Sequence, residues 1–239
     1  MRRLGIIAAF PAELRPLVRG WKQVRVRNSV PRARAWQGIL GPAECVAVAG
    51  GMGSSAAAAA CSFAESLSDL DELISFGWAG ALSCGMQGGC AYRVTEVIDG
   101  TNGERFMATP LASSGAALRL VTTDRVVLAR EKRALADRYQ AVLVDMEAAA
   151  VARIAQSKGI PFACIKAVSD TPADLLPDFS RFTDAEGGLR MPALLLHLAF
   201  RPRYWRSLAR MSKNSKTGAE AMVHEMQVLV ERDANHSGC

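Results

Sequence analysis

The stretch "VDMEAAAVARIAQSKGIPFACIKAVSD", residues 144–170, predicts a helix and a buried strand with an acidic side chain at either end. Residues 147–158 are rich in alanine and are followed by a Gly-Ile-Pro sequence, as expected where a helix ends. Residues 162–168 are mostly apolar and short enough for a buried strand. A helix that leads into a buried strand is typical of an α/β sheet. Glu147 would then lie at the start of the helix and Asp170 at the end of the strand.

Alternating apolar and amphipathic segments continue on both sides of this stretch. We expect strands at residues 4–10, 36–40, 45–49, 73–76, 94–98, 119–122 and 141–145. Helices are expected at 13–19, after the glycine-rich turn "GGMGSS" (50–55), at 131–139, from Pro202, and at 217–231. The sequence therefore predicts a three-layer α/β fold over residues 1–190, with a mixed, largely parallel central sheet flanked by helices. Residues 191–239 are expected to form a C-terminal helical extension that packs on this domain or projects from it.

The composition is that of an ordinary globular chain: 239 residues, 50% of them hydrophobic and 22% charged. Its six cysteines contain no C-x-x-C pair, which favours free thiols in a reducing compartment. The first apolar run is short and stops at Pro11, so it indicates a strand and not a secretory signal. Because no eighteen consecutive residues are apolar, we expect no membrane-spanning helix and a cytoplasmic location.

Two basic segments account for the net charge of +6. Residues 1–34 contain nine Lys or Arg and one acid, and residues 190–216 contain seven Lys or Arg and no acid. The rest of the chain is net acidic, so the overall charge does not describe a generally basic surface. We therefore expect no nucleic-acid partner.

Three acidic residues, Glu13, Glu147 and Asp170, each follow a predicted strand, so that we expect them at corresponding ends of parallel strands. Ligands of α/β sheets bind outside the carboxyl ends of the strands, so these carboxylates are candidate site residues. The alternative is that they are acids at helix starts on a solvated face. All three histidines lie in the C-terminal quarter, which argues against a Ser-His-Asp triad or a His-rich metal site. The "GGMGSS" turn lacks the spacing of nucleotide-binding glycine loops.

Several motifs in order resemble the nucleoside phosphorylase/nucleosidase superfamily, which includes purine nucleoside phosphorylases and methylthioadenosine/S-adenosylhomocysteine nucleosidases. "GIIAAFPAEL" (5–14) is similar to its first strand and catalytic-glutamate turn, "VDMEAAAVARIA" (144–155) to its Met-Glu motif, and "IKAVSD" (165–170) to its Ser-Asp motif. "GGMGSSAAAAA" and "FGWAGAL" fall between them in the expected order. The resemblance covers about residues 4–175.

The resemblance implies cleavage of the N-glycosidic bond of a purine nucleoside, without a metal or an organic cofactor, in a homo-oligomer. Asp170 would be the general acid toward N7 of the base, a role that an apolar environment would favour. Glu13 would activate the attacking water, and Glu147 would accept hydrogen bonds from the ribose. The residues that it implies in substrate binding are Gly51, Gly77, Trp78, Met146, Glu147 and Ser169.

The nucleophile stays open between water and phosphate. Phosphorylases of the superfamily carry an arginine before the turn that here reads "SFGWAGAL" (75–82), so the familiar phosphate clamp is missing and hydrolysis is favoured. Four other arginines remain candidates for phosphate binding, namely Arg25, Arg27, Arg32 and Arg34. Where the methylthioadenosine enzymes place an aromatic residue against the base, this chain has Arg125 and Val126. A nucleoside-binding protein without efficient turnover is a further alternative, although the presence of both Glu13 and Asp170 argues against it.

The segment "MPALLLHLAFRPRYWRSLARMSK" (191–213) is unusually apolar and basic. It resembles the tail of hopanoid-biosynthesis-associated phosphorylase-like proteins, which implies adenosylhopane, a lipid-linked nucleoside, as the substrate. Residues 190–216 would then contact a membrane surface peripherally, with Tyr204 and Trp205 at the interface. The alternative is that these residues pack on the core or on a second subunit, with their arginines reaching solvent.

Overall fold

The computed structural model of the protein describes residues 1–26, 33–109, 117–177, 182 and 201–236. The apolar run 191–200, the expected domain boundary at residue 190 and two candidate phosphate ligands, Arg27 and Arg32, lie outside these residues. In the described ranges, no helix is both long enough and apolar enough to cross a membrane.

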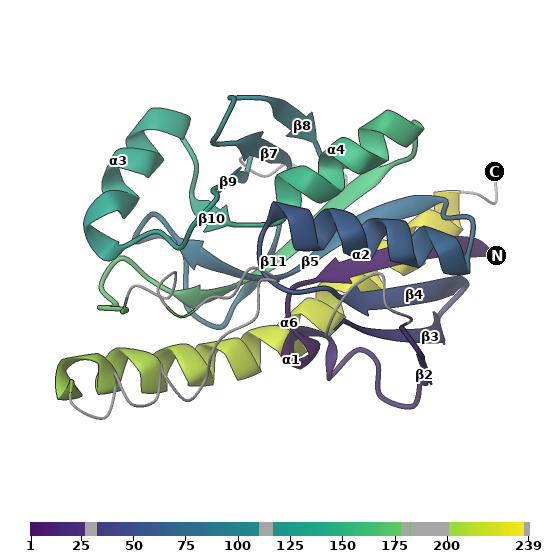
Figure 1. Ribbon diagram of the computed structural model, residues 1–239, viewed down its shortest axis with the longest axis horizontal. Helices are drawn as coiled ribbons and strands as arrows, with labels where there is room; N and C mark the ends of the chain where they lie inside the picture. Colours follow the sequence, from purple (N-terminus) through teal and green to yellow (C-terminus); the bar gives the residue numbers. More distant parts are fainter. Residues whose placement is uncertain (27–32, 110–116, 178–181, 183–200, 237–239) are drawn as a thin grey trace.

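The described strands form a single eleven-stranded sheet (Figure 1). They are β1 (Arg2–Ala8), β2 (Lys22–Val24), β3 (Arg34–Leu40), β4 (Ala43–Ala49), β5 (Glu72–Ala81), β6 (Ala91–Arg93), β7 (Glu96–Asp99), β8 (Arg105–Met107), β9 (Arg119–Thr122), β10 (Leu143–Asp145) and β11 (Phe162–Asp170). The helices are α1 (Pro11–Leu14), α2 (Ser54–Leu67), α3 (Ala129–Tyr139), α4 (Ala148–Lys158) and α6 (Trp205–His236), with a 3-10 turn, η2 (Pro202–Tyr204), before α6.

Strand β5 is the branch point of the sheet. It pairs in parallel with β1 along its first part and with β11 along most of its length, and at its carboxyl end it also pairs with β10 in the antiparallel direction. The strand order is β2-β3-β4-β1-β5-β10-β9-β7-β8, and β6 pairs with β11. The expected mixed α/β sheet is confirmed. The expectation that β1, β10 and β11 present their ends in the same direction is wrong for β10, which runs back along β5.

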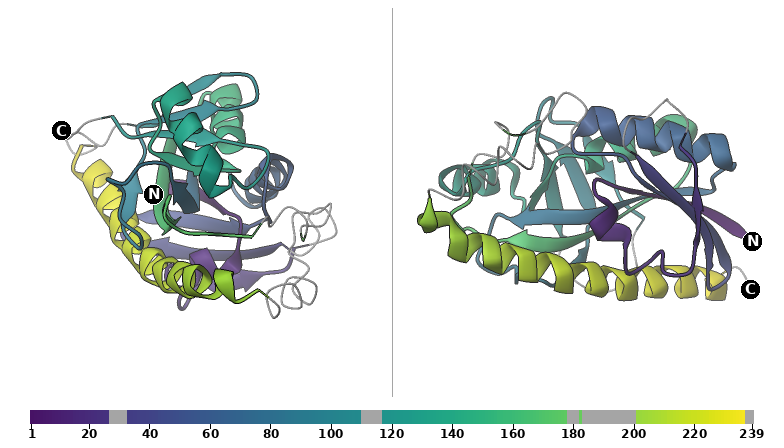
Figure 2. Two further views of the ribbon diagram at one scale, coloured as in Figure 1. Left: turned by 90° about the vertical axis from the view of Figure 1, so that its left-hand side faces the viewer. Right: turned by 60° about the horizontal axis from the view of Figure 1, so that its bottom comes forward.

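Helices cover both faces of this sheet, giving the three expected layers (Figure 2). Helices α2 and α4 pack against one face, and α1 and α6 lie on the other. The alternation of side chains along β1 serves both layers, because Leu4 and Ile6 join the core on the α6 side while Ile7 joins the core under α2 and α4. Alanines dominate the buried faces of α2 and α4, so these helices lie close to each other and to the strands.

The C-terminal segment forms one long helix and not the two helices expected from the sequence. Gly218, near the expected start of the second helix at residue 217, lies inside α6. A Cβ on Gly218 would stand 2.7 Å from Cβ of Ala167 in β11, so the glycine allows the helix to rest directly on the sheet. Three short strands, β2, β6 and β8, were not anticipated either, since three residues give no clear alternation.

The second half of α6 belongs to the core of the α/β sheet. Met222 and Met226 are fully buried, and Leu229 and Val230 are nearly so. They contact apolar residues of β1, β4 and β11 in one cluster. This part of the chain is therefore packed on the sheet.

We expect Met226→Ala to lower the free energy of unfolding by about 2–5 kcal/mol, because it removes a fully buried side chain between helix and sheet. The matched control is Gln227→Ala, one residue further along the same helix and exposed, which should change stability by less than about 0.5 kcal/mol. Urea unfolding of the full chain measures both. Equal, small effects of the two substitutions would contradict the packing of α6 on the sheet.

Candidate active site

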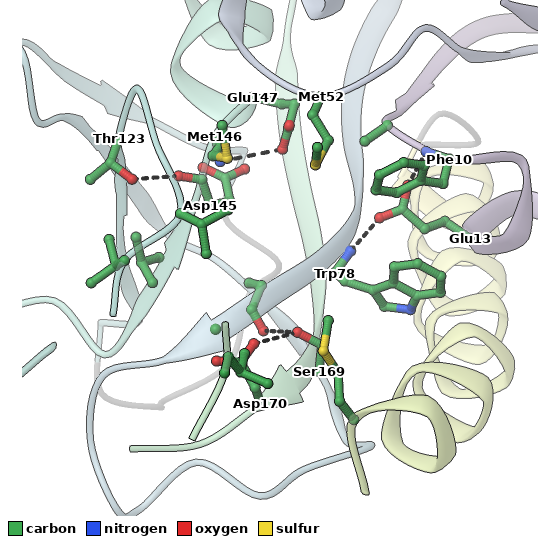
Figure 3. A pocket seen from close by; sticks show the side chains of 18 of the residues that line it. Phe10, Glu13, Met52, Trp78, Thr123, Asp145, Met146, Glu147, Ser169 and Asp170 are labelled. Atoms are coloured by element: carbon green, nitrogen blue, oxygen red, sulfur yellow. Dashed lines mark hydrogen bonds between the residues drawn. The ribbon is translucent and has the colours of Figure 1, made fainter. Parts of the chain in front are cut away.

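One cavity of about 760 Å³ opens beside the carboxyl-terminal half of β5 (Figure 3). Its volume lies in the range of sites that bind small organic ligands. Six of the residues predicted from the sequence line it, namely Glu13, Trp78, Met146, Glu147, Ser169 and Asp170. The other two, Gly51 and Gly77, are not among its lining residues. The Gly51 N–H donates to the carbonyl of Ala9, so it ties the glycine-rich turn to the end of β1.

Glu13 is held in one orientation by backbone donors. It lies in α1, directly after β1, and is 2% exposed. The N–H of Phe10 donates to Oε2 at 2.6 Å, and the N–H of Trp78 donates to Oε1 at 2.7 Å. Gly77 makes room for this carboxylate, because a Cβ there would stand 2.6 Å from Oε1. The strand β5 and the turn after β1 thus fix Glu13 at the cavity wall (Figure 3).

Burial raises the pKa of Glu13 above its ordinary value. The hydrogen bonds from Phe10 and Trp78, together with the charge of Lys166, offset this rise only in part. A carboxylate with a raised pKa is a better proton acceptor than a solvated one. Glu13 can therefore take a proton from a nucleophile in the cavity.

Glu147 begins α4 and joins it to the glycine-rich turn before α2. Its Oε1 accepts a hydrogen bond from the N–H of Gly53 at 2.8 Å, and its Oε2 accepts one from the N–H of Met146 at 3.3 Å. Burial and the neighbouring carboxylate of Asp145 raise the pKa of Glu147 to about 7. The side chain is half-buried and faces the cavity, where it can accept hydrogen bonds from hydroxyl groups.

A buried ion pair lies beneath these two glutamates. Lys166 of β11 places Nζ 2.8 Å from Oδ2 of Asp145, and the two side chains are 2% and 0% exposed. Thr122 donates to the other oxygen, Oδ1, at 2.7 Å. Burial by itself lowers the pKa of Lys166, but the carboxylates of Asp145 and Glu147 outweigh burial and hold that pKa above its ordinary value. Lys166 was not among the residues predicted from the sequence, although a lysine inside an apolar strand is a signal of a buried, paired cation.

Asp170 stands at the opposite end of the cavity, at the end of β11. Its Oδ1 accepts a hydrogen bond from the hydroxyl of Ser169 at 2.7 Å. Its Oδ2 lies 2.5 Å from Nζ of Lys132, a buried residue of α3. Asp170 is buried at the end of an apolar strand, as expected, but its surroundings are not purely apolar, because an ammonium group contacts it. Nothing in the sequence distinguishes Lys132 from the other cations of the polar segment 129–139, so it was missed.

Trp78 and the helix α6 form one wall of the cavity. The Trp78 ring lies 6.2 Å from the ring of Phe10, and its Nε1–H donates to the carbonyl of Ser215 in α6 at 3.0 Å. The side chain of Asn214 donates to the carbonyl of Ser169 at 3.2 Å. The long helix therefore holds both the β5 wall and the Ser-Asp end in place.

The outer part of the cavity is apolar. Val126, Leu176 and Met211 line it, and they pack with Phe182 in a small separate cluster. Arg15, Arg34 and Arg125 also line the cavity. Within the described ranges, no group of three or more His, Cys, Asp or Glu side chains is placed to hold a metal ion.

These features define a class: an α/β protein whose sheet carries a ligand cavity with paired acids at one end and a single acid at the other. The comparison with family models identifies this class directly. The model of the phosphorylase superfamily matches residues 3–118 and 107–198. The chain belongs to the phosphorylase superfamily, as the sequence motifs indicated. A comparison with curated protein sequences gave no significant match.

Solved structures of nucleosidases share the fold over almost the whole chain. The 5'-methylthioadenosine/S-adenosylhomocysteine nucleosidase of Helicobacter pylori aligns with a TM-score of 0.70 at 14% identity, covering 97% of this chain and 99% of that one. The 5'-methylthioadenosine nucleosidase of Arabidopsis thaliana gives 0.68 at 18% identity, with 95% and 96% covered. Futalosine hydrolase of H. pylori gives 0.64 at 15% identity, with 94% and 98% covered. At these identities the likeness concerns the fold.

The raised pKa of Glu147 predicts a pH-dependent effect of Glu147→Gln on the stability of the ligand-free protein. The unfolded carboxyl titrates near pH 4.3 and the folded one at about 7, so the wild type loses stability as the pH rises between these two values. The glutamine variant does not titrate there. Between pH 5 and 8.5, the free energy of unfolding of the variant should therefore rise relative to that of the wild type by on the order of 2 kcal/mol.

Urea unfolding at a series of pH values measures this difference, with Glu44→Gln as the control because Glu44 is exposed. The control should follow the wild-type curve. Parallel curves for wild type and Glu147→Gln would show that Glu147 does not keep its proton in the folded protein.

Proposed function

We propose that this protein hydrolyses the N-glycosidic bond of a purine nucleoside. The observation that carries the proposal is that Glu13, Glu147 and Asp170 line one cavity from two ends. Cleavage of this bond needs a proton for the departing base and negative charge near the sugar, which becomes oxocarbenium-like. In this cavity, Asp170 would serve the departing base at one end, and Glu13 and Glu147 would place negative charge near the sugar at the other. Membership of the phosphorylase superfamily is consistent with this proposal.

The geometry suggests a division of roles. Glu147 would accept hydrogen bonds from the ribose hydroxyls, with Met146 beside the sugar. Glu13, oriented by two backbone N–H groups, would take a proton from the attacking water. Both carboxylates would stabilise the positive charge that develops on the sugar. Asp170, with Ser169, would meet the base at the other end.

Phosphorolysis is the second candidate, because two exposed arginines line the same cavity as Glu13. Arg34 is one of the four arginines that the sequence suggested for phosphate, and Arg15 follows α1 directly. Both are exposed and suited to binding an anion at the cavity mouth. Hydrolysis remains the first proposal because Glu13 is positioned to activate water.

For the substrate, we propose an adenine-type nucleoside with an apolar 5' extension, with adenosylhopane as the candidate. The apolar outer cavity formed by Val126, Leu176 and Met211 supports this proposal. Peripheral contact of residues 201–216 with a membrane surface would serve a lipid-linked substrate. Supporting it, Trp205 is 55% exposed and no acid interrupts the cations of this segment. Assembly into a homo-oligomer is likewise a proposal.

We predict that Asp170→Asn lowers purine release by about 10²–10⁴-fold, because an amide cannot take part in proton transfer to the base. Glu13→Gln should lower kcat with little change in KM, whereas Glu147→Gln should raise KM as well. Chromatography of free purine, from a panel of nucleosides with and without phosphate, measures all three. Wild-type rates in both the Asp170 and the Glu13 variants would refute these roles. Binding of a nucleoside by the wild type without release of base would indicate a binding protein instead.

We predict salt-sensitive binding to anionic vesicles that depends on exposed cations at the start of α6. Arg210 is unsuited to this test, because it pairs at 2.6 Å with the buried side chain of Asp174. The test variant instead changes three exposed cations to Glu: Arg203, Arg206 and Lys213. Each cation near an anionic surface contributes on the order of 1 kcal/mol, so co-sedimentation should be lost.

The matched control has the same change in net charge, placed in the N-terminal basic segment. It changes Arg19, Lys22 and Arg25 to Glu, all of which are exposed. The control should bind vesicles like the wild type. If the wild type binds no vesicle of any composition, or if both variants bind equally, membrane contact through α6 is excluded.

A further inference from the structure

Helix α3 buries a single residue, and that residue is a lysine. The helix is strongly polar, and Lys132 is its only buried side chain, 2% exposed. Glu131 caps the start of the helix by accepting the N–H of Leu128 and pairing with Arg125. A helix that packs by an apolar face would bury Leu or Ala at this position. Here the buried position delivers an ammonium group to the cavity, which Lys132 lines.

The ammonium group of Lys132 meets Asp170 and leaves that carboxylate fully engaged. Nζ of Lys132 lies 2.5 Å from Oδ2, and the hydroxyl of Ser169 donates to Oδ1 at 2.7 Å. Both oxygens of the Asp170 carboxylate therefore accept hydrogen bonds from protein donors. With both oxygens accepting, the carboxylate presents no proton of its own to a departing base. The proton must come from a neighbour, and Lys132 is the neighbour in contact.

A purely structural role does not explain well why Lys132 and Asp170 form a buried ion pair beside the cavity. Buried ion pairs contribute little net stability, because desolvation offsets their attraction. This pair also faces the cavity and not the interior of the core. Lys166, by comparison, is enclosed in the sheet with Asp145 and Thr122. The two buried lysines therefore differ in position, and only Lys132 is among the residues that line the cavity.

We propose that Lys132 is a positioning residue that orients Asp170 and supplies the proton that leaves with the base. The inference rests on the proposed nucleosidase function and extends it. As the C1′–N9 bond breaks, its electron pair moves to the purine. Asp170 passes a proton to N7 and receives one from Nζ of Lys132. Water adds hydroxide to C1′ while Glu13 takes the remaining proton, and both side chains then exchange protons with solvent.

The test compares two leaving groups that differ in their need for a proton. Adenosine requires protonation of its base, whereas p-nitrophenyl riboside releases a stable anion without it. Lys132→Gln keeps a donor to Asp170 but has no charge. Lys132→Arg keeps the charge but cannot give up a proton. Arg133→Met, an exposed cation next to it on α3, is the control.

We expect both Lys132 variants to lose adenine release by about 100-fold or more, and to cleave p-nitrophenyl riboside within tenfold of the wild type. The control should match the wild type on both substrates. Thermal unfolding confirms that each variant is folded. Wild-type adenine release by either Lys132 variant, or equal losses on the two substrates, would overturn the inference. If the wild type itself releases no adenine, the proposed nucleosidase function fails on this substrate. That outcome differs from failure of the role of Lys132, in which the wild type is active and the Lys132 variants match it.

Discussion

The burial of Lys166 among carboxylates is the interaction on which the paired-acid end of the cavity depends. Asp145 and Glu147 raise its pKa, and in return its charge limits the rise in the pKa of both glutamates at the cavity wall. Without that ammonium group, three acids would be desolvated side by side with no compensating charge. Lys166 can hold this position because β11 lies in the middle of the sheet, paired with β5 on one side and β6 on the other. The electrostatics of the site therefore follow from the branching of the sheet at β5.

The helix α6 connects this centre to the C-terminus of the chain. Its second half fills the core beneath β1 and β11, while its first half runs along the cavity. Hydrogen bonds to Trp78 and Ser169 join it to the two walls that carry Glu13 and Asp170. Because the same helix packs in the core and contacts both walls of the cavity, a change in the packing of α6 would also displace those walls. Met211 of α6 lines the cavity, and the exposed cations Arg206 and Lys213 lie close to it on the same helix.

Sequence patterns predicted most of the sheet because its strands are buried and strongly apolar. The strand and helix after residue 144 were predicted closely, since Gly159 and Pro161 mark where the helix ends. The direction of β10 could not be predicted, because a three-residue strand carries no signal of its partner. Glu13, Glu147 and Asp170 were found through motifs, whereas Lys132 was not. Its burial depends on where α3 docks, which is a property of the tertiary structure and not of the local sequence.

We propose above all that this cavity directs water to the sugar carbon of a nucleoside. The most direct measurement is mass spectrometry of the sugar product after reaction in water enriched in oxygen-18, with phosphate present. We expect free purine and a ribose that carries one oxygen-18 atom at C1′. A ribose 1-phosphate product without the label would show that phosphate is the nucleophile. No cleavage of any nucleoside in the panel would contradict the proposed nucleosidase activity.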